Sequence, residues 1–447
     1  MKKIEKRWAG EWLRLLAFFL VPALVIALAN RVLLAPDLYS YYTLREMTSR
    51  DDIDLALVGD SVVTYNIDPE VLTEKTGMQA FDVGMGLIGL TGDVEMTRLL
   101  LEKNKPQYVV LMADIYTLLA ESEGLTPQCN MTPFIQNPLH ALSTYMNYVR
   151  SDGKILDRLL LFKCRPNTSW GDVKGMWALH SDPAAYYVEH DMANMIQVYS
   201  GRGYIRVSRD MGGQNNAAAK EDTRPYDLTD RDSLTAQNQR KILEFVKLCK
   251  SHGVKPIVAL PYDLPVHHFA IGGYTLTGGV LEAFCKANDI EFFDFSRAKA
   301  LACLDGYYYD TQHMSSDGSQ IWSTFLADFF MRYQAGESVD SLFYATQEER
   351  LSHVDFITNA WAQGEGKDGM LTVWAECNCG PNVEPEYRFV VEETDGTQTV
   401  VSDYGQTDVV ELDEAQFEKG IQCVKVWARA RGNTEREPMV YTYEVTQ

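Results

Sequence analysis

Five short apolar segments that alternate with helical segments constrain the fold of this chain more than any other feature of its sequence. A strand that is apolar throughout is buried on both faces, as happens when helices cover both sides of a parallel sheet. Gly77 and Gly253, which directly follow two of the helical segments, are typical helix stops. The pattern predicts an α/β fold with a five-stranded parallel sheet flanked by helices. The expected strands are residues 55–58, 80–83, 108–113, 255–260 and 290–295, and the expected helices are residues 69–76, 92–103, 237–252, 277–287 and 319–333.

The N-terminal segment is basic first and apolar afterwards. Basic residues precede an apolar run over residues 15–29, and residues 32–34 bring its length near the roughly 20 residues that a helix needs to cross a bilayer. Basic residues before such a run place the N-terminus inside the cell. We therefore expect residues 1–35 to form an uncleaved transmembrane anchor in the cell membrane, with the rest of the chain extracytoplasmic. The alternative is a cleavable signal peptide with Ala27-Leu28-Ala29 as its cleavage site.

The C-terminal part of the chain changes to an alternation of period two. Tyr387 and Phe389 alternate with more polar neighbours, and Asp395-Gly396 is a typical hairpin turn. This pattern predicts an antiparallel β-sandwich over residues 350–447. Its composition resembles that of the small tyrosine-rich sandwich modules of bacterial cell-surface proteins. The polar, Glu-rich residues 334–350 are expected to be a linker or a short connecting helix.

Residues from about 116 to 230 interrupt the alternation of strands and helices. They contain several prolines and aromatic residues and a polar run at 212–216. We interpret them as a partly helical insertion after the third strand, lying over the carboxyl edge of the sheet, where loops usually carry substrate contacts. The alternative is an insertion that only packs against the rest of the domain and carries no substrate contacts. The expected domains are thus the anchor at 1–35, an α/β domain at 36–335 that contains this insertion, and the sandwich at 350–447.

Charge and composition exclude several classes of function. The formal net charge of −21 argues against a nucleic-acid surface, because phosphate binding needs clustered Lys and Arg. Eight cysteines are too few and too scattered for a disulfide scaffold, and Cys377-Asn378-Cys379 has no nearby His or second Cys pair to complete a metal site. The glycine pairs at 272–273 and 278–279 lack the strand and the lysine of a phosphate loop. We therefore expect no metal, no cofactor and no nucleic-acid partner.

Two short motifs, far apart in the sequence, contain the residue types of a catalytic serine site. Gly59-Asp60-Ser61 follows the first expected strand, so Ser61 should lie at a tight strand-to-helix turn at the carboxyl edge of the sheet, where open α/β folds place their sites. In Asp310-x-x-His313, the Asp can orient and charge-stabilise the imidazole that takes the proton of the serine. Each motif is common on its own, and the alternative is a turn serine with a surface histidine. Their order, with the fold signals between them, favours a catalytic site.

Taken together, the strand alternation and these two motifs resemble the SGNH (GDSL-type) hydrolase superfamily over roughly residues 52–333. The resemblance implies a flavodoxin-like fold and a serine esterase, in which Ser61 is the nucleophile, His313 the general base and Asp310 its orienting partner. It also implies that the segment Ser315-Ser316-Asp317 caps the last helix.

The resemblance further implies an oxyanion hole with three donors. These would be the backbone N–H of Ser61, a glycine after the second strand and an asparagine after the third. Gly86 is the first candidate for the glycine donor, and Gly84 is the second. Asp114 stands nearest the asparagine position, and an ionised carboxylate cannot donate a hydrogen bond. Either burial protonates Asp114, or another group donates, or catalysis is weak.

This departure at Asp114 shifts the resemblance toward divergent, membrane-anchored proteins of cell-envelope acylation, such as the D-alanyl transfer proteins of teichoic acid and the acetylation proteins of alginate. We expect an extracytoplasmic esterase or acyltransferase that acts on acyl esters of a cell-envelope glycan, with a membrane-bound acyl-transfer protein as a further partner. The alternative is a catalytically inert protein of the same fold that binds an envelope polymer or a partner protein. The candidate substrate contacts are Gly84, Tyr116, Asp263 and His267.

Overall fold

The computed structural model describes residues 11, 14, 17–18, 20–30, 34, 37–114, 117–118, 124–161, 197–207, 234–262, 274–300, 307–309, 313–380, 382–434 and 437–445 of the 447-residue chain. The chain divides into two compact units. The first comprises Met1–Thr64, Met78–Arg206 and Thr235–Val258, and the second comprises Tyr65–Gly77, Val207–Leu234 and Ala259–Gln447. The first unit therefore contains Ser61, and the second contains His313.

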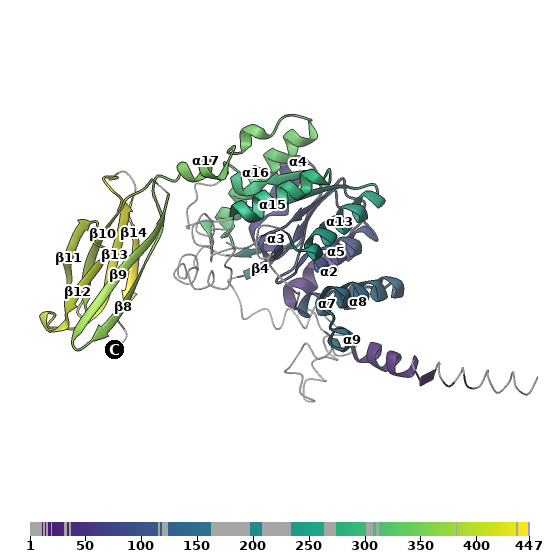
Figure 1. Ribbon diagram of the computed structural model, residues 1–447, viewed down its shortest axis with the longest axis horizontal. Helices are drawn as coiled ribbons and strands as arrows, with labels where there is room; N and C mark the ends of the chain where they lie inside the picture. The colour runs from purple at the N-terminus through teal and green to yellow at the C-terminus, as the bar shows by residue number, and fades with distance from the viewer. Residues whose placement is uncertain are drawn as a thin grey trace, which may run out of the picture. The chain divides into compact units, whose positions relative to one another are not determined.

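Five strands form the parallel sheet that the sequence predicts (Figure 1). They are β1 (Leu55–Gly59), β2 (Ala80–Gly84), β3 (Tyr108–Met112), β6 (Lys255–Leu260) and β7 (Phe292–Asp294). Their spatial order is β2-β1-β3-β6-β7, which is the order of doubly wound, flavodoxin-like sheets. Every residue of β1 and β2 is buried, which explains why these segments are largely apolar instead of alternating. The predicted fold class of this region is confirmed.

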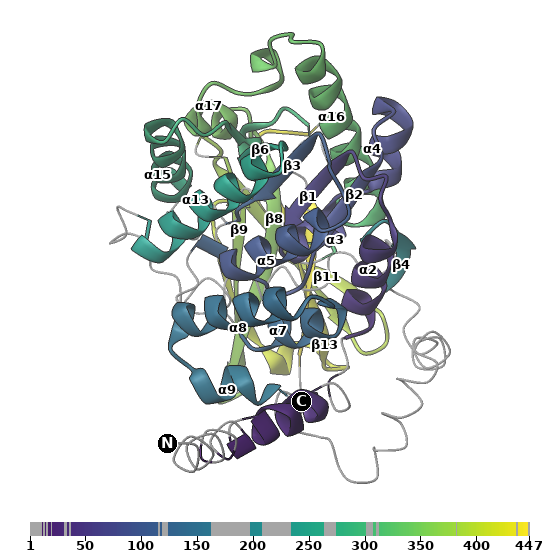
Figure 2. The same cartoon turned by 90° about the vertical axis from the view of Figure 1, so that its right-hand side faces the viewer.

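Helices flank the sheet, and their ends follow the capping signals of the sequence. They are α2 (Leu38–Ser49), α3 (Ser61–Asn66), α4 (Pro69–Thr76), α5 (Leu90–Leu101), α13 (Ala236–Ser251), α15 (Tyr274–Ala287) and α16 (Ser316–Gln334). Asp68 caps α4, and Gly77 ends it in the left-handed conformation. Ser315 caps α16, as the resemblance implies. In Figure 2, α5 lies beside α13 and α4 beside α16, and each pair is in contact. Helices α2 and α3 are not among the predicted elements.

The described part of the insertion is mainly helical. Its elements are α7 (Thr126–Met131), η1 (Thr132–Phe134), α8 (Pro138–Asp152), α9 (Ile155–Leu159), β4 (Gln197–Gly201) and β5 (Tyr204–Val207). α7 reaches the carboxyl end of β2, where Asn130 Nδ2 donates to Met85 Sδ at 3.6 Å. α8 lies along α5 instead, with His140 Nδ1 2.6 Å from Glu102 Oε1. Of these elements, α7 therefore lies where the insertion was expected, and α8 does not. Residues 162–196 and 208–233 lie outside the described residues.

The β4–β5 hairpin covers the outer edge of the sheet at β2. An uncovered edge strand is a template for aggregation, because its backbone groups have no partner. Here the Asp82 N–H of β2 donates to the Arg202 carbonyl at 2.8 Å, and the Arg202 side chain reaches Gln79 Oε1 at 3.1 Å. A Cβ on Gly203 would lie 1.9 Å from the Asp82 carbonyl oxygen, so this turn requires glycine. The sequence does not predict the hairpin, because its strands are too short to show a periodicity.

A buried ion pair holds α9 against the end of α8. Arg158 Nη2 lies 3.0 Å from Asp152 Oδ2, and both side chains are fully buried. The Arg158 guanidinium also lies over the Tyr148 ring, with Cζ 4.6 Å from the ring centre. Lys154 approaches the same carboxylate at 3.7 Å, but its side chain is half exposed. Arg158 is therefore the cation that compensates the charge of the buried Asp152 carboxylate.

We expect Arg158→Met to lower the free energy of unfolding by about 3–5 kcal/mol, because it leaves the buried Asp152 charge without compensation. Urea titration followed by circular dichroism would measure the change. Lys154→Met is the matched control, with an expected change within about 0.5 kcal/mol, since exposed ion pairs contribute little. Equal effects of the two variants would contradict the assignment of the ion pair.

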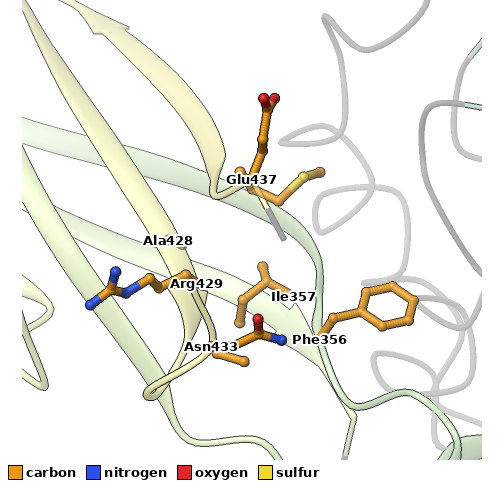
Figure 3. A pocket seen from close by; sticks show the side chains of 8 residues that line it. Phe356, Ile357, Ala428, Arg429, Asn433 and Glu437 are labelled. Carbon is orange, nitrogen blue, oxygen red and sulfur yellow. The ribbon is translucent and has the colours of Figure 1, made fainter. Parts of the chain in front are cut away.

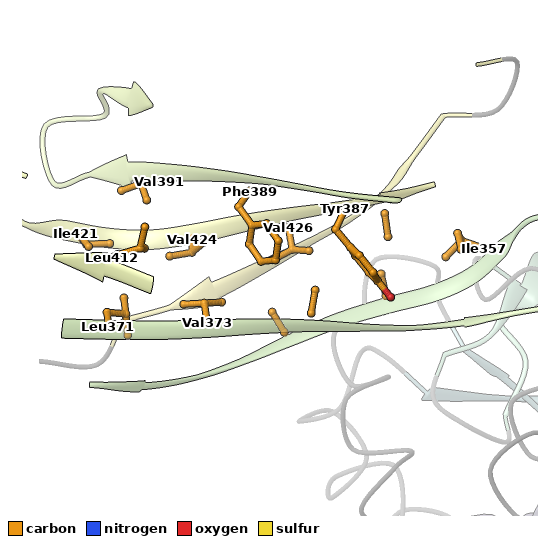
Figure 4. Packing of buried hydrophobic residues seen from close by; sticks show 14 residues of the cluster. Ile357, Leu371, Val373, Tyr387, Phe389, Val391, Leu412, Ile421, Val424 and Val426 are labelled. Carbon is orange, nitrogen blue, oxygen red and sulfur yellow. The ribbon is translucent and has the colours of Figure 1, made fainter. Parts of the chain in front are cut away.

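The C-terminal residues form the predicted antiparallel β-sandwich. One sheet has the order β12-β9-β8, and the other has the order β11-β10-β13-β14. Figure 4 shows Val373, Phe389 and Val424 among the side chains that fill the space between the sheets. Phe389 and Val424 stand at the inward positions of the period-two pattern. The strands are β8 (Ile357–Lys367), β9 (Met370–Cys379), β10 (Pro385–Glu393), β11 (Gln398–Gly405), β12 (Val409–Asp413), β13 (Ile421–Ala430) and β14 (Met439–Glu444).

The segment that precedes the sandwich belongs to the core of the second unit. It contains η7 (Asp340–Leu342) and α17 (Gln347–Ser352). The Phe343 ring stacks on that of Phe295, with 5.9 Å between the ring centres. Arg350 is 1% exposed, and its guanidinium carbon lies 4.9 Å from the centre of the Tyr262 ring. The short connecting helix, one of the two expected alternatives, is present as α17. This packing makes residues up to about 352 part of the core of the second unit, although their composition is that of a polar linker.

Among the residues that the structure describes, no helix is long and apolar enough to cross a membrane. Residues 20–30 are helical. Most of the residues before them, and residues 31–33 and 35–36, lie outside the described part of the chain. The expected anchor at 1–35 therefore stays a prediction.

Candidate functional site

Three strand ends bring candidate groups to one edge of the sheet. Gly59, the last residue of β1, is in register with Gly84 of β2 and Met112 of β3. The residues that follow these three strands are therefore neighbours at the carboxyl edge, where open α/β sheets place their sites. These residues include Ser61, Gly86 and Asp114, the groups that the resemblance assigns to an oxyanion hole.

Ser61 is the first residue of α3 and is half-buried. The turn into this helix is fixed by Asp60 Oδ1, which accepts a hydrogen bond from the Val62 N–H at 2.8 Å. A Cβ on Gly59 would lie only 2.7 Å from Val63 Cγ2, so the turn requires glycine. The predicted tight strand-to-helix turn at Ser61 is confirmed.

The two glycines after β2 have different surroundings. A Cβ on Gly84 would lie 2.7 Å from Thr64 Cγ2 and 3.0 Å from the Asp60 carbonyl oxygen, so Gly84 allows α3 to pack on the sheet. Gly86 is exposed, and a Cβ there would meet no atom within 4 Å. This difference favours Gly86 for the role of donor to a substrate. Gly84 has a packing role, and its expected substrate contact stays a prediction.

Leu87, which sequence reasoning missed, is the residue at this edge with the most unusual backbone. Its φ is 59°, in the left-handed region that a branched side chain rarely adopts, and it is 82% exposed. An exposed leucine in this conformation costs about 1–2 kcal/mol and buries little in return. Backbone strain of this kind clusters at functional sites. No signal in the sequence marks it, because the strain arises from the turn and not from the residue type.

We expect Leu87→Gly to raise the free energy of unfolding by about 0.5–1 kcal/mol, because relief of the strain exceeds the entropic cost of glycine. Urea titration would measure this gain, and turnover of an ester would show whether activity falls at the same time. Asp368→Gly is the matched control, because Asp368 also has a positive φ, 51°, but lies in a hairpin of the sandwich and tolerates it better. A loss of stability in Leu87→Gly would contradict the conclusion that the backbone at Leu87 is strained.

Three buried carboxyl groups lie close to the turn at Ser61. Asp60 is 8% exposed, Asp114 is 4% exposed and Asp93 of α5 is fully buried. Burial raises the pKa of the Asp60 carboxyl well above its ordinary value, and the neighbouring charge of Asp114 raises it further. A hydrogen bond between the two carboxyl groups and the charge of Asp93 act in the same direction, whereas the hydrogen bond from the Val62 N–H opposes them. Asp60 and Asp114 thus form a buried acid pair.

His313 lies in the second unit and packs against the last turn of α3. Its ring centre is 4.5 Å from that of Tyr65. The next residue, Met314, donates its backbone N–H to Asn66 Oδ1 at 2.7 Å. Two consecutive residues of α3 therefore hold the segment around His313 in place, directly before the cap of α16 at Ser315.

Four predicted site residues lie outside the described residues: Asp310, Tyr116, Asp263 and His267. Their roles stay predictions. Within the described part of the chain, no group of three or more His, Cys, Asp or Glu side chains is placed to hold a metal ion.

The sandwich contains a cavity of about 220 Å³, between the start of β8, the end of β13 and the start of β14 (Figure 3). Phe356, Ile357 and Ala428 contribute apolar surface to its lining. Arg429 also lines it, but both its Nε and its Nη2 already donate to Glu386 Oε2 at 3.1 Å.

Solved structures that resemble this chain include one of low sequence identity. This structure, of a proposed acylhydrolase from Bacteroides fragilis, matches with a TM-score of 0.28 and 10% identity, over 65% of this chain and 96% of that chain. A similarity of this size carries no argument about function. No protein-family model matches the chain, and no curated protein matches it. The assignment of a function therefore rests on the geometry of the site.

Proposed function

We propose that this chain is a serine esterase or acyltransferase whose nucleophile is Ser61. The observation that carries the proposal is the position of Ser61, at a glycine-dependent turn on the carboxyl edge of the sheet, beside the ends of β2 and β3. The placement of His313 supports it, because its ring packs on Tyr65 in the helix that begins with Ser61. Asp310 would orient the imidazole of His313.

In the proposed reaction, Ser61 Oγ attacks the carbonyl carbon of an ester while His313 takes the hydroxyl proton. The carbonyl oxygen becomes an oxyanion and accepts hydrogen bonds from the backbone N–H groups of Ser61 and Gly86. Collapse of this intermediate breaks the bond to the alcohol, which leaves with the proton from His313. Water or a sugar hydroxyl then attacks the acyl-enzyme, gives its proton to His313 and regenerates Ser61.

The proposed substrate is an acyl ester, acetyl or D-alanyl, of a cell-envelope glycan. What supports this substrate class is the resemblance of the motifs to the divergent branch of cell-envelope acylation, together with the basic and apolar N-terminus. A membrane-bound acyl-transfer protein is the proposed partner, and Tyr116, Asp263 and His267 are proposed substrate contacts.

A second candidate is a binding protein in which the site is inert. One observation favours it: Asp114 stands at the asparagine position of the oxyanion hole, buried and close to another carboxyl group. An ionised Asp114 would repel an oxyanion instead of stabilising it. In this case the α/β domain and the sandwich would hold an envelope polymer or a partner protein.

A fluorophosphonate probe on the purified chain separates the two candidates, because only an activated serine reacts with it. The esterase is expected to gain one label, which peptide mapping places on Ser61, and Ser61→Ala is expected to gain none. Heat-denatured protein should also stay unlabelled, since activation depends on the folded site. A folded wild-type chain that is not labelled would support the binding protein.

The proposed location has its own test. If residues 1–35 anchor the chain with its N-terminus inside, external protease is expected to remove the sandwich, residues 350–447, from intact protoplasts or spheroplasts. Immunoblotting against the sandwich would follow the loss, with a cytoplasmic protein as the protected control. Protection equal to that of the control would contradict the topology.

A further inference from the structure

We propose that the outward side of α8 and α9 lies on the surface of a lipid bilayer, beside the point where the N-terminal helix enters it. The proposal rests on the anchor at residues 1–35 that belongs to the proposed function, and it adds a second contact between the chain and the membrane. The surface consists of Leu139, Leu142 and Met146 of α8 together with Ile155 and Leu156 of α9, and we call these five side chains the apolar face.

α8 buries polar side chains and exposes apolar ones. Its buried residues are His140, Thr144, Asn147 and Tyr148. Thr144 Oγ1 donates to Glu95 Oε2 at 2.5 Å, and Asn147 Nδ2 donates to Glu95 Oε1 at 2.7 Å, so this side of the helix is bonded to a buried carboxylate of α5. A helix at a surface in water does the reverse and turns its apolar stripe to the core. The environment outside α8 is therefore expected to be apolar.

The apolar face extends over both helices. Leu139, Leu142 and Met146 are spaced three and four residues apart, which places them on one side of α8, and they are 77%, 57% and 37% exposed. α9 is in contact with α8 and adds Ile155 and Leu156, which are 58% and 66% exposed. Exposed apolar side chains that gather on adjoining elements mark an interaction site, whereas scattered ones need no explanation.

The N-terminal helix, residues 20–30, indicates what covers the apolar face. Asn30 Nδ2 at the end of this helix donates to the Leu159 carbonyl of α9 at 2.9 Å, and Leu34 is buried against Leu161. In both views of the chain this helix, drawn in purple, lies beside α9 (Figures 1 and 2). Leu28 of the helix is itself 62% exposed. A membrane anchor that ends at this point would bring α9 and α8 to the surface of the bilayer.

Basic side chains at the junction of α8 and α9 fit the headgroups of anionic lipids. Arg150 is exposed in the last turn of α8, and the Lys154 side chain, directly before α9, is 50% exposed. Asp157 is the exposed acid of the two helices. The formal net charge of the whole chain is −21, so cations prevail here against the general trend. An apolar face with cations beside it is typical of helices that lie in a membrane interface.

Contact with the bilayer is expected to fix the position of the proposed site relative to the membrane. Cys129 of α7 is buried with Leu34, which follows the N-terminal helix. The next residue, Asn130, donates to Met85 Sδ at 3.6 Å, directly before Gly86 at the carboxyl edge of the sheet. Two consecutive residues of α7 therefore connect the membrane end of the chain to this edge. A site held at one height above the bilayer suits an acyl group that a membrane-bound protein delivers.

The test replaces single leucines of the full-length chain by the photoreactive amino acid p-benzoylphenylalanine, in vesicles of equal parts phosphatidylcholine and phosphatidylglycerol. Leu142 and Leu156 are the test positions. Leu243 of α13 is the matched control, because it is an exposed leucine of the same unit, 41% exposed, outside the apolar face. After irradiation, the yield of lipid adducts at the two test positions is expected to exceed that at Leu243 on the order of tenfold, because a docked side chain contacts lipid continuously. Thermal melts would show that each variant is folded.

The same replacement at Leu24, in the N-terminal helix, reports on the anchor separately. Lipid adducts at Leu24, with equal yields at Leu142, Leu156 and Leu243, would overturn the proposal and leave the anchor intact. An absence of adducts at Leu24 would contradict the anchor, and the yields at the two test positions would still decide whether α8 and α9 contact lipid. Crosslinks between two copies of the chain, in place of lipid adducts, would overturn the proposal and assign the apolar face to self-association.

Discussion

Ser61→Ala and His313→Ala are each expected to lower kcat/KM for a small acetyl ester by about 10⁴-fold or more. The first change removes the nucleophile, and the second removes the base that activates it. Because the two residues would act as one unit, the double variant is expected to lose little more than either single variant. Steady-state hydrolysis of a chromogenic acetyl ester, corrected for the uncatalysed rate, would measure the three losses.

A matched control comes from the end of α13, where Ser251 and His252 are adjacent and exposed. Ser251→Ala and His252→Ala remove the same chemical groups away from the proposed site, and both are expected to keep kcat/KM within about twofold. Circular dichroism melts of all variants would show that the fold is intact. Full activity in a folded Ser61→Ala chain would contradict the esterase proposal and leave the binding protein as the proposed function.

A chain truncated after Gly336 is expected to unfold or aggregate, whereas a chain truncated after Val354 is expected to fold. The first truncation removes Phe343 and Arg350 from the core of the second unit. Phe343 is half-buried, so the loss of its side chain costs less than the about 3–5 kcal/mol of a fully buried phenylalanine. Loss of the buried Arg350 adds to this cost, and the sum is a large share of the stability of a typical domain. Both truncations remove the entire sandwich, so a difference between them reports on residues 337–354. Thermal melts and size-exclusion chromatography would compare the two.

Single substitutions in the full-length chain separate the contributions of this segment. Phe343→Ala is expected to lower the melting temperature through lost aromatic packing against Phe295. Burial raises the pKa of Asp294 above its ordinary value, and the charges of Arg297 and Arg350 partly oppose this shift. Arg350→Met keeps most of the side-chain volume but removes one of these two cations. It is therefore expected to destabilise the chain more at pH 7 than at pH 4, where Asp294 can take up a proton. Stable folding of the chain truncated after Gly336 would show that this segment contributes nothing essential.

The strands and long helices could be predicted because each has a local signal. β1 and β2 are buried on both faces, so nearly every side chain is apolar, and α4 carries both a cap at Asp68 and a stop at Gly77. In the sandwich, one face of each strand packs on the opposite sheet, and Phe389 and Val424 therefore fall at every second position. These patterns depend only on the order of residues along the chain.

α3 and the segment at 340–352 could not be predicted in the same way. α3 is only six residues long and contains two adjacent valines, which favour strands, yet the sharp turn after Gly59 makes it helical. The segment at 340–352 is polar in composition, and its buried Arg350 has the appearance of a surface residue in the sequence. The turn that precedes α3 decides its structure, whereas contacts with distant parts of the chain decide that of the segment at 340–352.

The sequence by itself determined the architectures of the α/β region and of the sandwich. It also determined the turn at Gly59-Asp60-Ser61 and the capped helix that follows His313. Each of these features depends on residues a few positions apart. Only the tertiary structure decided which of these residues meet. The pairing of β1 with β3 brings Asp60 and Asp114 to the same edge of the sheet, and the packing of His313 on Tyr65 ties the second motif to the helix of the first. The physical reason is that hydrogen bonds, burial and charge act through space, across more than 200 residues of sequence in the case of Tyr65 and His313. The protonation of a carboxyl such as Asp60 is therefore a property of the folded sheet edge and cannot be assigned from the residue type.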